Sequence, residues 1–334
     1  MPEPSAHSPL PDAPRHGWIP HPLWLLAVAV VLLGAAIACT VYFHPTARLI
    51  REIKALDGSV DARYDGPHWL ENLIDKERLT VFHRIRGIAV YGPAGAGQWL
   101  QSVTGHGESL GRRGVTDEWL VRLSGINSLD TLELTDNPIR DAGIAHLQDL
   151  PNLGYLNLNR TKVGDKTVKD LNRFPQLEYL LLDETRVTDA GLVYLRGSSR
   201  LRLLSLGSTV VTDAGLENLE DLTDLAYLNL SGTLVTDAGM VKLLRFTKLK
   251  HLSLGATAVT DAGLQQLKSL SSLSSLEIAG TPVTAAGIAD LKTALPKLDA
   301  QQRLKGIWRS STTSESPFSS GTAMRGKRCS SEKA

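Results

Sequence analysis

The hexapeptide VTDAGL, residues 211–216, decides the fold because close variants of it return at a constant spacing. An eighth copy carries alanine, Ala285, where the others carry aspartate. A fixed period of this length is the sequence signature of a solenoid, in which each unit stacks on the next. The aspartates follow one another every 24 residues, at Asp117, Asp141, Asp165, Asp189, Asp213, Asp237 and Asp261.

Within one unit the apolar spacing changes from that of a strand to that of a helix. Residues 227–230, YLNL, alternate, so the two leucines face one side of a strand. Residues 215–219, GLENL, space their leucines by three, which predicts a short helix with Thr212 or Asp213 as its N-cap. A single unit cannot bury its leucines alone. We therefore expect an α/β solenoid with a concave parallel β-sheet and convex short helices.

The leucine pattern resembles that of leucine-rich repeat proteins, L-x-x-L-x-L-x-x-[N/C/T]. It is present in LAYLNLSGT, residues 225–233, and in LKHLSLGAT, residues 249–257, and the resemblance covers about residues 115–300. The VTDAGL segment is similar to the F-box-associated, cysteine-containing-like subclass and to bacterial membrane-anchored leucine-rich repeat proteins. No F-box is evident upstream. The resemblance implies a module for protein–protein interaction.

Other columns of the repeat have structural explanations. A glycine column allows adjacent helices to approach. The aspartates could form a calcium ladder, but the glycine-rich nonapeptide of calcium-binding solenoids is absent and an N-cap role explains each aspartate. We therefore expect no metal and no cofactor. A threonine column, headed by Asn137, is expected to satisfy turn backbones with side-chain hydrogen bonds, and comprises Thr161, Thr185, Thr209, Thr233, Thr257 and Thr281.

The loop GPAGAGQW, residues 92–99, has the two glycines of a phosphate-binding P-loop at the right spacing. Glutamine and tryptophan stand where that loop needs its lysine and its hydroxyl residue, so we expect no nucleotide site. With the apolar residues 88–90 as a strand, the loop becomes the strand-to-helix turn of a degenerate first repeat, residues 88–114. This alignment places Gly97 in register with Asp117.

Residues 23–43, LWLLAVAVVLLGAAIACTVYF, form an uncharged apolar run. They follow a proline-rich N-terminus, residues 1–22, expected to be disordered, and precede a linker helix and N-terminal cap, residues 44–87. A helix of this length would span about 31 Å, so we expect a single-pass membrane helix. A cleaved signal peptide is the alternative. Basic residues in the linker helix favour a cytoplasmic C-terminal domain.

Composition limits the classes of function. The chain has 36 Lys and Arg against 35 Asp and Glu, which leaves no general basic footprint for nucleic acid. Two cysteines, Cys39 and Cys329, are too few for a disulfide framework or a cysteine-rich zinc site. Residues 301–334 are rich in serine and basic residues, and we expect a disordered, solvated tail. Weak attraction to anionic lipid or polyanions is the alternative.

The repeat register explains the residues that could otherwise act as nucleophiles, acid–base groups or metal ligands. We therefore expect no enzyme, no catalytic residue and no small-molecule substrate. We expect a concave face that binds an unidentified protein, with a structural envelope scaffold as the alternative. Tyrosine is enriched at binding hot spots, and parallel strands about 4.8 Å apart align equivalent side chains in rows. The first expected row is Tyr155, Tyr179, Leu203, Tyr227 and His251; the second is Asn157, Leu181, Ser205, Asn229 and Ser253.

Overall fold

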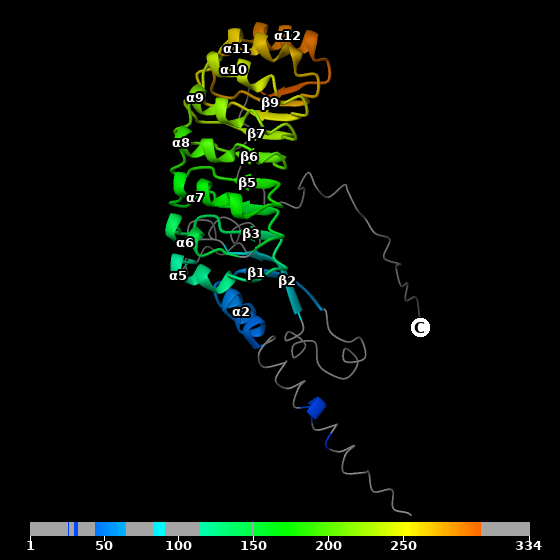
Figure 1. Cartoon of the computed structure of the whole chain (residues 1–334). Coiled ribbons are helices and arrows are strands. Elements are labelled where there is room, and N and C mark those ends of the chain that lie inside the picture. The colour runs from blue at the N-terminus through cyan, green and yellow to red at the C-terminus, as the bar shows by residue number, and fades with distance from the viewer. Residues whose placement is uncertain are drawn as a thin grey trace, which may run out of the picture. The chain divides into compact units, whose positions relative to one another are not determined.

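The computed structural model describes residues 26, 30–32, 44–64, 83–90, 114–148 and 150–301. The loop 92–99 and most of the segments expected to be disordered therefore lie outside the described residues. The chain divides into two compact units, Met1–Arg48 with Gly66–His83 and Leu49–Asp65 with Arg84–Ala334. The repeats belong to the second unit, in which the strands stack along one side and the helices along the other (Figure 1).

Within the described residues, the strands form one sheet of ten strands whose spatial order is their order in the sequence. Each strand from β2 to β9 pairs in parallel with the next one, which confirms the parallel sheet expected from the repeat. The strands are β1 (Ser59–Tyr64), β2 (His83–Ala89), β3 (Thr131–Glu133), β4 (Tyr155–Asn157), β5 (Tyr179–Leu181), β6 (Leu203–Ser205), β7 (Tyr227–Asn229), β8 (His251–Ser253), β9 (Ser275–Glu277) and β10 (Asp299–Gln301).

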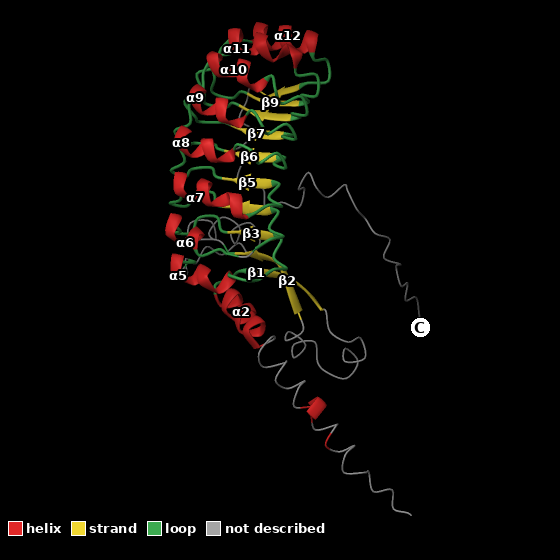
Figure 2. Cartoon of the chain, viewed as in Figure 1, coloured by secondary structure: helices red, strands yellow, loops and turns green. Residues whose placement is uncertain are grey.

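Short helices return the chain from each strand to the next and lie along the opposite side of the unit (Figure 2). Several continue into a 3-10 turn, as α9 does at Glu217–Leu219. Leucines from both elements meet between the two layers and are almost completely buried. The helices are α2 (His44–Ala55), α5 (Asp117–Leu120), α6 (Asp141–Ala145), α7 (Asp165–Asp170), α8 (Asp189–Leu192), α9 (Asp213–Leu216), α10 (Asp237–Leu243), α11 (Asp261–Gln266) and α12 (Ala285–Ala294).

The sheet register corrects the alignment of the first repeat. β2 pairs directly with β3, with Ile88 opposite Leu132, so no strand lies between them. The helix that connects these two strands is α5, which begins at Asp117. Ile88 and Asp117 therefore belong to one turn of the solenoid. Residues 91–113, which come between this strand and helix in the sequence, lie outside the described residues.

The single-pass membrane helix expected over residues 23–43 is contradicted: within the described part of the chain, no helix is long and apolar enough to cross a membrane. A spanning helix needs about 20 consecutive apolar residues, whereas α2 has 12 residues and several charges. Of residues 23–43, the structure describes only residue 26 and residues 30–32. The single-pass localisation and the cytoplasmic placement deduced from that helix are corrected with it.

The first described helix of the second unit closes the solenoid near β1. Leu49, Ile50 and Ile53 of α2 are buried, as expected for the apolar face of the linker helix. Glu52 on the same helix forms an ion pair with Arg122 of the first turn, in which the Arg122 Nη1 lies 2.5 Å from the Glu52 Oε2. The helix is thereby fixed to the core through both apolar packing and a charge pair.

The aspartate of the VTDAGL segment is not the N-cap of its helix, contrary to the role expected for it from the sequence. The N-cap is the threonine: in α9 the Thr212 hydroxyl accepts a hydrogen bond from the Ala214 N–H. The aspartate of the preceding turn, Asp189, accepts from the Thr212 N–H at 2.8 Å and from the Thr212 hydroxyl at 2.6 Å. Each aspartate therefore bonds to the start of the next helix. The same bridge joins Asp165 to Thr188, Asp213 to Thr236, Asp237 to Thr260 and Asp261 to Thr284.

The glycine of the motif leaves room for that carboxylate. A Cβ on Gly191 would lie 3.1 Å from the Asp165 Cγ and closer still to its Oδ1. The expected approach of adjacent helices is therefore an approach to a specific carboxylate. Gly215, Gly239, Gly263 and Gly287 each face the aspartate of the preceding turn in the same way.

Two departures from the motif agree with this explanation. In α7 the threonine position is Gly164 and the glycine position is Thr167, and the Thr167 hydroxyl donates to Asp141 at 2.7 Å. The lost hydroxyl is thus supplied from the other position. In the last copy of the motif Ala285 replaces aspartate, and no further copy follows it in the sequence to use the acceptor.

The threonine column has the role expected of it. Thr209, for example, donates from its hydroxyl to the Leu206 carbonyl at 2.6 Å. At the head of the column, the Asn137 amide donates to the Val90 and Leu134 carbonyls. These bonds satisfy carbonyls in the turns that follow the strands.

The bridge predicts a coupled pair of substitutions. Gly191→Ala should destabilise the fold by about 1–3 kcal/mol because its methyl group overlaps Asp165. Asp165→Ala should cost about 1–3 kcal/mol because Thr188 loses its acceptor. The double variant should be more stable than the sum of the two effects by about 1 kcal/mol, measured by urea unfolding.

The matched control is Ala285→Asp, which places an aspartate where no further copy of the motif follows in the sequence. Its free energy of unfolding should stay within about 0.5 kcal/mol of the parent chain. Strict additivity in the Gly191 and Asp165 cycle would show that the glycine does not make room for the carboxylate.

Candidate functional site

The first row of concave side chains expected from the sequence is present. Tyr155, Tyr179, Leu203, Tyr227 and His251 occupy one register position across β4 to β8. All five are half-buried, while the leucine that follows each of them in the strand is buried. The rings of Tyr155 and Tyr179 have centroids 6.2 Å apart, and those of Tyr227 and His251 lie 5.9 Å apart. The row is thus continuous, with Leu203 between two aromatic pairs.

The second row is more deeply involved in internal hydrogen bonds than its sequence suggested. Asn157, Ser205 and Ser253 are buried, whereas Leu181 and Asn229 are half-buried. The Asn229 side-chain amide donates to the Ser205 hydroxyl at 3.0 Å. The Ser253 hydroxyl donates to Glu277 at 3.2 Å. Leu181 is therefore the side chain in this row that presents apolar surface.

Glu133, on β3, is a buried carboxylate that sequence reasoning did not single out. It accepts hydrogen bonds from the Thr135 hydroxyl, from the Asn157 amide at 2.9 Å and from the Tyr155 hydroxyl at 3.3 Å. Burial raises the pKa of Glu133, against the opposing effect of these bonds. The network ties both rows to the first strands of the repeats. One signal was available in the sequence, because Glu133 is an acidic residue in a column of mostly neutral ones.

Asp183 is a second carboxylate that sequence reasoning missed, and it lies at the end of β5 near the middle of the sheet. Its Oδ1 accepts from the Ser205 hydroxyl at 2.5 Å, the Gly207 N–H at 2.6 Å and the Asn229 amide at 3.1 Å. Burial raises its pKa, with a smaller contribution from neighbouring Glu184. One backbone N–H and the side chains of β6 and β7 thus converge on one carboxylate oxygen.

These environments also act on the first row. Burial, together with the charge of Asp183, raises the pKa of Tyr227 to about 12. Burial lowers the pKa of His251, and the positive charge of Lys250 adds to that effect. Both shifts favour the uncharged forms of Tyr227 and His251 at neutral pH.

The raised pKa of Asp183 predicts a pH-dependent stability difference. The folded chain holds this proton more tightly than the unfolded chain, so the stabilising contribution is complete below the ordinary pKa and is lost as pH rises through the raised one. Asp183→Asn keeps an oxygen for the three donors and removes the buried charge. From about pH 4 to about pH 8, the Tm of the variant should rise relative to that of the parent, by roughly 2–4 °C per kcal/mol.

Thermal unfolding followed by circular dichroism measures both curves. Glu178→Gln serves as the control, because Glu178 forms a partly exposed ion pair with Arg202 near the start of the strands. A constant Tm difference between parent and Asp183→Asn across the pH range would show that burial does not perturb this carboxylate.

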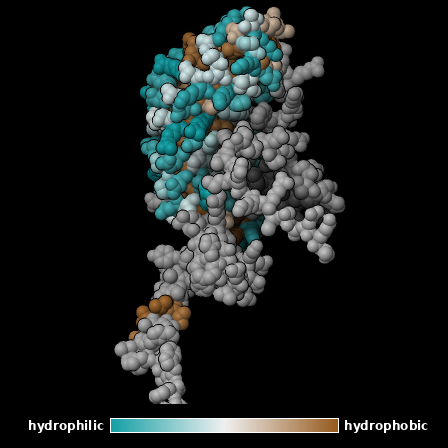
Figure 3. All heavy atoms as spheres, turned by 90° about the vertical axis from the view of Figure 1, so that its right-hand side faces the viewer, coloured by the Kyte–Doolittle hydropathy of each residue, from teal (hydrophilic) through white to brown (hydrophobic). Residues whose placement is uncertain are grey.

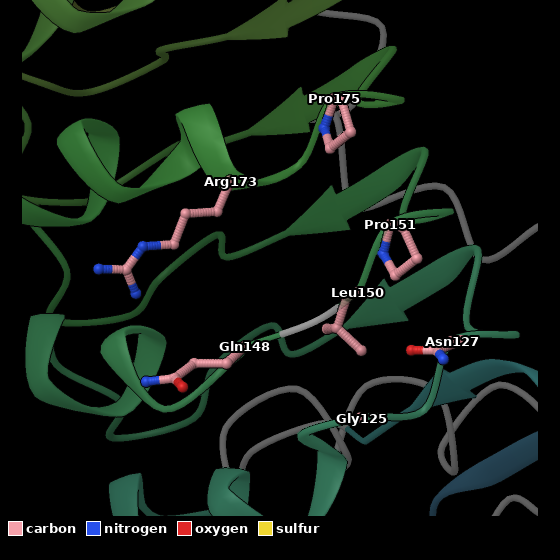
Figure 4. A pocket seen from close by; sticks show the side chains of 7 residues that line it. All are labelled: Gly125, Asn127, Gln148, Leu150, Pro151, Arg173 and Pro175. Carbon is pink, nitrogen blue, oxygen red and sulfur yellow. The ribbon is translucent and has the colours of Figure 1, made fainter.

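A shallow hollow of about 810 Å³ lies away from the rows, beside the turns that lead from the helices into β3, β4 and β5. Figure 4 shows Gln148 and Arg173 on one side of it and Pro151 and Pro175 on the other. Arg173, in the 3-10 turn that follows α7, pairs with Asp170 at the end of α7. In a small-molecule site a few polar groups converge on one point, whereas the polar groups that line this hollow do not.

Within the described ranges, no group of three or more His, Cys, Asp or Glu side chains is arranged to hold a metal ion. Where described residues are visible in Figure 3, which looks onto the strand side, hydrophilic residues predominate. The arrangement of the described concave residues therefore suits recognition of another molecule through a surface with tyrosines, two leucines and carboxylates.

Three comparisons bear on the family. Residues 126–147 match the model of a family described as Leucine Rich repeat. Among solved structures, the chain is similar to internalin C2 (inlC2) from Listeria monocytogenes str. 4b F2365, with 23% sequence identity and a TM-score of 0.44. The similarity covers 63% of this chain and 93% of that chain. No curated protein matches the chain.

Proposed function

Because the chain is a leucine-rich repeat protein, we propose that it acts as a protein-binding module and that its concave sheet carries the binding surface. The observation that supports the proposal is the register of Tyr155, Tyr179, Leu203, Tyr227 and His251 in one half-buried row. Large aromatic side chains held on a rigid support supply contact area at low entropic cost, and tyrosine is enriched at hot spots.

The members of the row are suited to different tasks. Tyr155 donates a hydrogen bond to Glu133, and burial raises the pKa of Tyr227. Tyr179 and Leu203 are adjacent in the register, half-buried, and followed in the second row by the half-buried Leu181. We place the centre of the contact on Tyr179, Leu203 and Leu181, with Asn157 and Asn229 at its edges.

Affinity capture tests the proposal. The full chain is immobilised, exposed to lysate of its source cells, and the retained proteins are quantified by mass spectrometry. Tyr179→Ala and Leu203→Ala should each lower the amount of a specific partner retained, because truncating a hot-spot side chain costs about 1–2 kcal/mol, or about a tenfold loss of affinity.

Tyr194→Ala is the matched control. Tyr194 is 44% exposed on the helix side and lies beside Lys169, so its loss removes a surface tyrosine without touching the sheet. Partner retention should match that of the parent chain. Equal retention by the parent, Tyr179→Ala and Leu203→Ala would remove this row as the site, and capture of nothing specific would favour the structural scaffold.

A further inference from the structure

The ends of the strands form an acidic border of the concave face. Between β3 and β9, the described residues in the last strand position and in the three positions after it include five carboxylates and one basic side chain, Arg160. The carboxylates are Glu133, Asp136, Asp183, Glu184 and Glu277. Carboxylates therefore outnumber basic side chains in this border, although the whole chain is nearly balanced in charge.

The charge is not cancelled within the border. Arg160 is committed to Asp136, with its Nε 2.5 Å and its Nη2 2.6 Å from the two carboxylate oxygens. Asp183 accepts the hydrogen bonds of Ser205, Gly207 and Asn229 on Oδ1, and Oδ2 accepts none of these three. Glu184, next to it, is exposed. Asp183 and Glu184 thus place two carboxylates side by side near the middle of the sheet.

The sequence that follows the last strand has the opposite charge. Residues 302–334 contain seven Lys or Arg and two Glu. Three of the basic residues, Arg303, Lys305 and Arg309, come within nine residues of β10, which is the edge strand of the same sheet. Opposite charges on a surface and on a tethered segment attract each other over about one Debye length, about 8–10 Å in ordinary buffers.

The tether is long enough to reach. β5 and β10 are five strand positions apart, which corresponds to roughly 24 Å at about 4.8 Å per strand. An extended chain covers that distance in about eight residues, at about 3.3 Å per residue. A segment tethered to the surface it binds has an effective concentration in the millimolar range, so weak contacts suffice for occupancy.

We propose that the basic segment 302–334 docks in cis on the acidic border around Asp183 and Glu184 and so competes with the protein partner for the concave face. The competition rests on the proposed function, whereas the docking itself does not. A docked segment places cationic side chains against carboxylates, with their aliphatic stems beside Leu181 and Leu203. A partner that binds the same face must displace it.

Zero-length carbodiimide cross-linking of the full chain tests the docking. This reagent joins lysine amines to carboxylates that are in contact. Lys305, Lys327 or Lys333 should become linked to Asp183, Glu184 or Glu277, and the yield should fall sharply from about 0.05 M to about 1 M salt, where the Debye length is about 3 Å. Mixing chains of normal and ¹⁵N-labelled mass separates links within one chain from links between two.

A charge variant separates specific docking from chance encounters. Asp183→Asn with Glu184→Gln should also lower the yield of links to Glu277, which is unchanged in that variant. Glu217→Gln with Glu220→Gln on the helix side should leave it unaltered. Links mainly to Glu217 and Glu220, links only between two chains, or no salt dependence would each overturn docking in cis.

The two proposals can fail independently. Cross-linking needs no partner, so a negative result removes the docked segment and leaves the capture experiment valid. If instead the row variants capture as much partner as the parent while the salt-sensitive links persist, the segment docks on this face but the partner binds elsewhere.

Discussion

A carboxylate that reaches from one turn of the solenoid to the first residue of the next helix holds the stack together. Asp189 receives both the N–H and the hydroxyl of Thr212, and Gly215 leaves the space that this carboxylate occupies. The threonine is in turn the N-cap of its own helix. One short segment therefore donates the hydrogen bonds between turns, caps its own helix and leaves space for the carboxylate of the preceding turn. The rest of the repeat depends on this spacing, because the leucines meet only when successive turns keep one register.

The same register determines what the opposite side of the unit can display. Each strand from β3 to β10 contributes only three residues, so the concave face consists of a few aligned rows rather than a varied surface. The side chains within each aligned row can differ from one strand to the next, and they do so near the centre of the sheet. Leu181, Leu203 and Asp183 stand there among polar neighbours. Apolar contact area and negative charge thus occur close together on a support that packing makes rigid.

The sequence predicted the tyrosine row but missed the two carboxylates beside it. The row could be predicted because it needs only the period and the alternation of a strand. Glu133 and Asp183 could not, because their environments come from donors on neighbouring strands: Asp183 is bonded by residues 22, 24 and 46 positions away. The membrane helix is a prediction of another kind. It rested on the length and apolar character of residues 23–43, and no helix among the described residues is long and apolar enough to cross a membrane.

The sequence by itself determined that this chain is a stack of leucine-rich units, which residues face the core, and which tyrosines share a row. These properties follow from local spacing, since a period of 24 residues and the alternation within each strand leave little freedom. Only the tertiary structure decided that the aspartates bridge turns instead of capping their own helices, that Ile88 shares a turn with Asp117, and that Asp183 accepts from three donors. Each of these three features is a contact between neighbouring turns. The spacing of residues inside one repeat does not show which atoms of the next turn a side chain will contact.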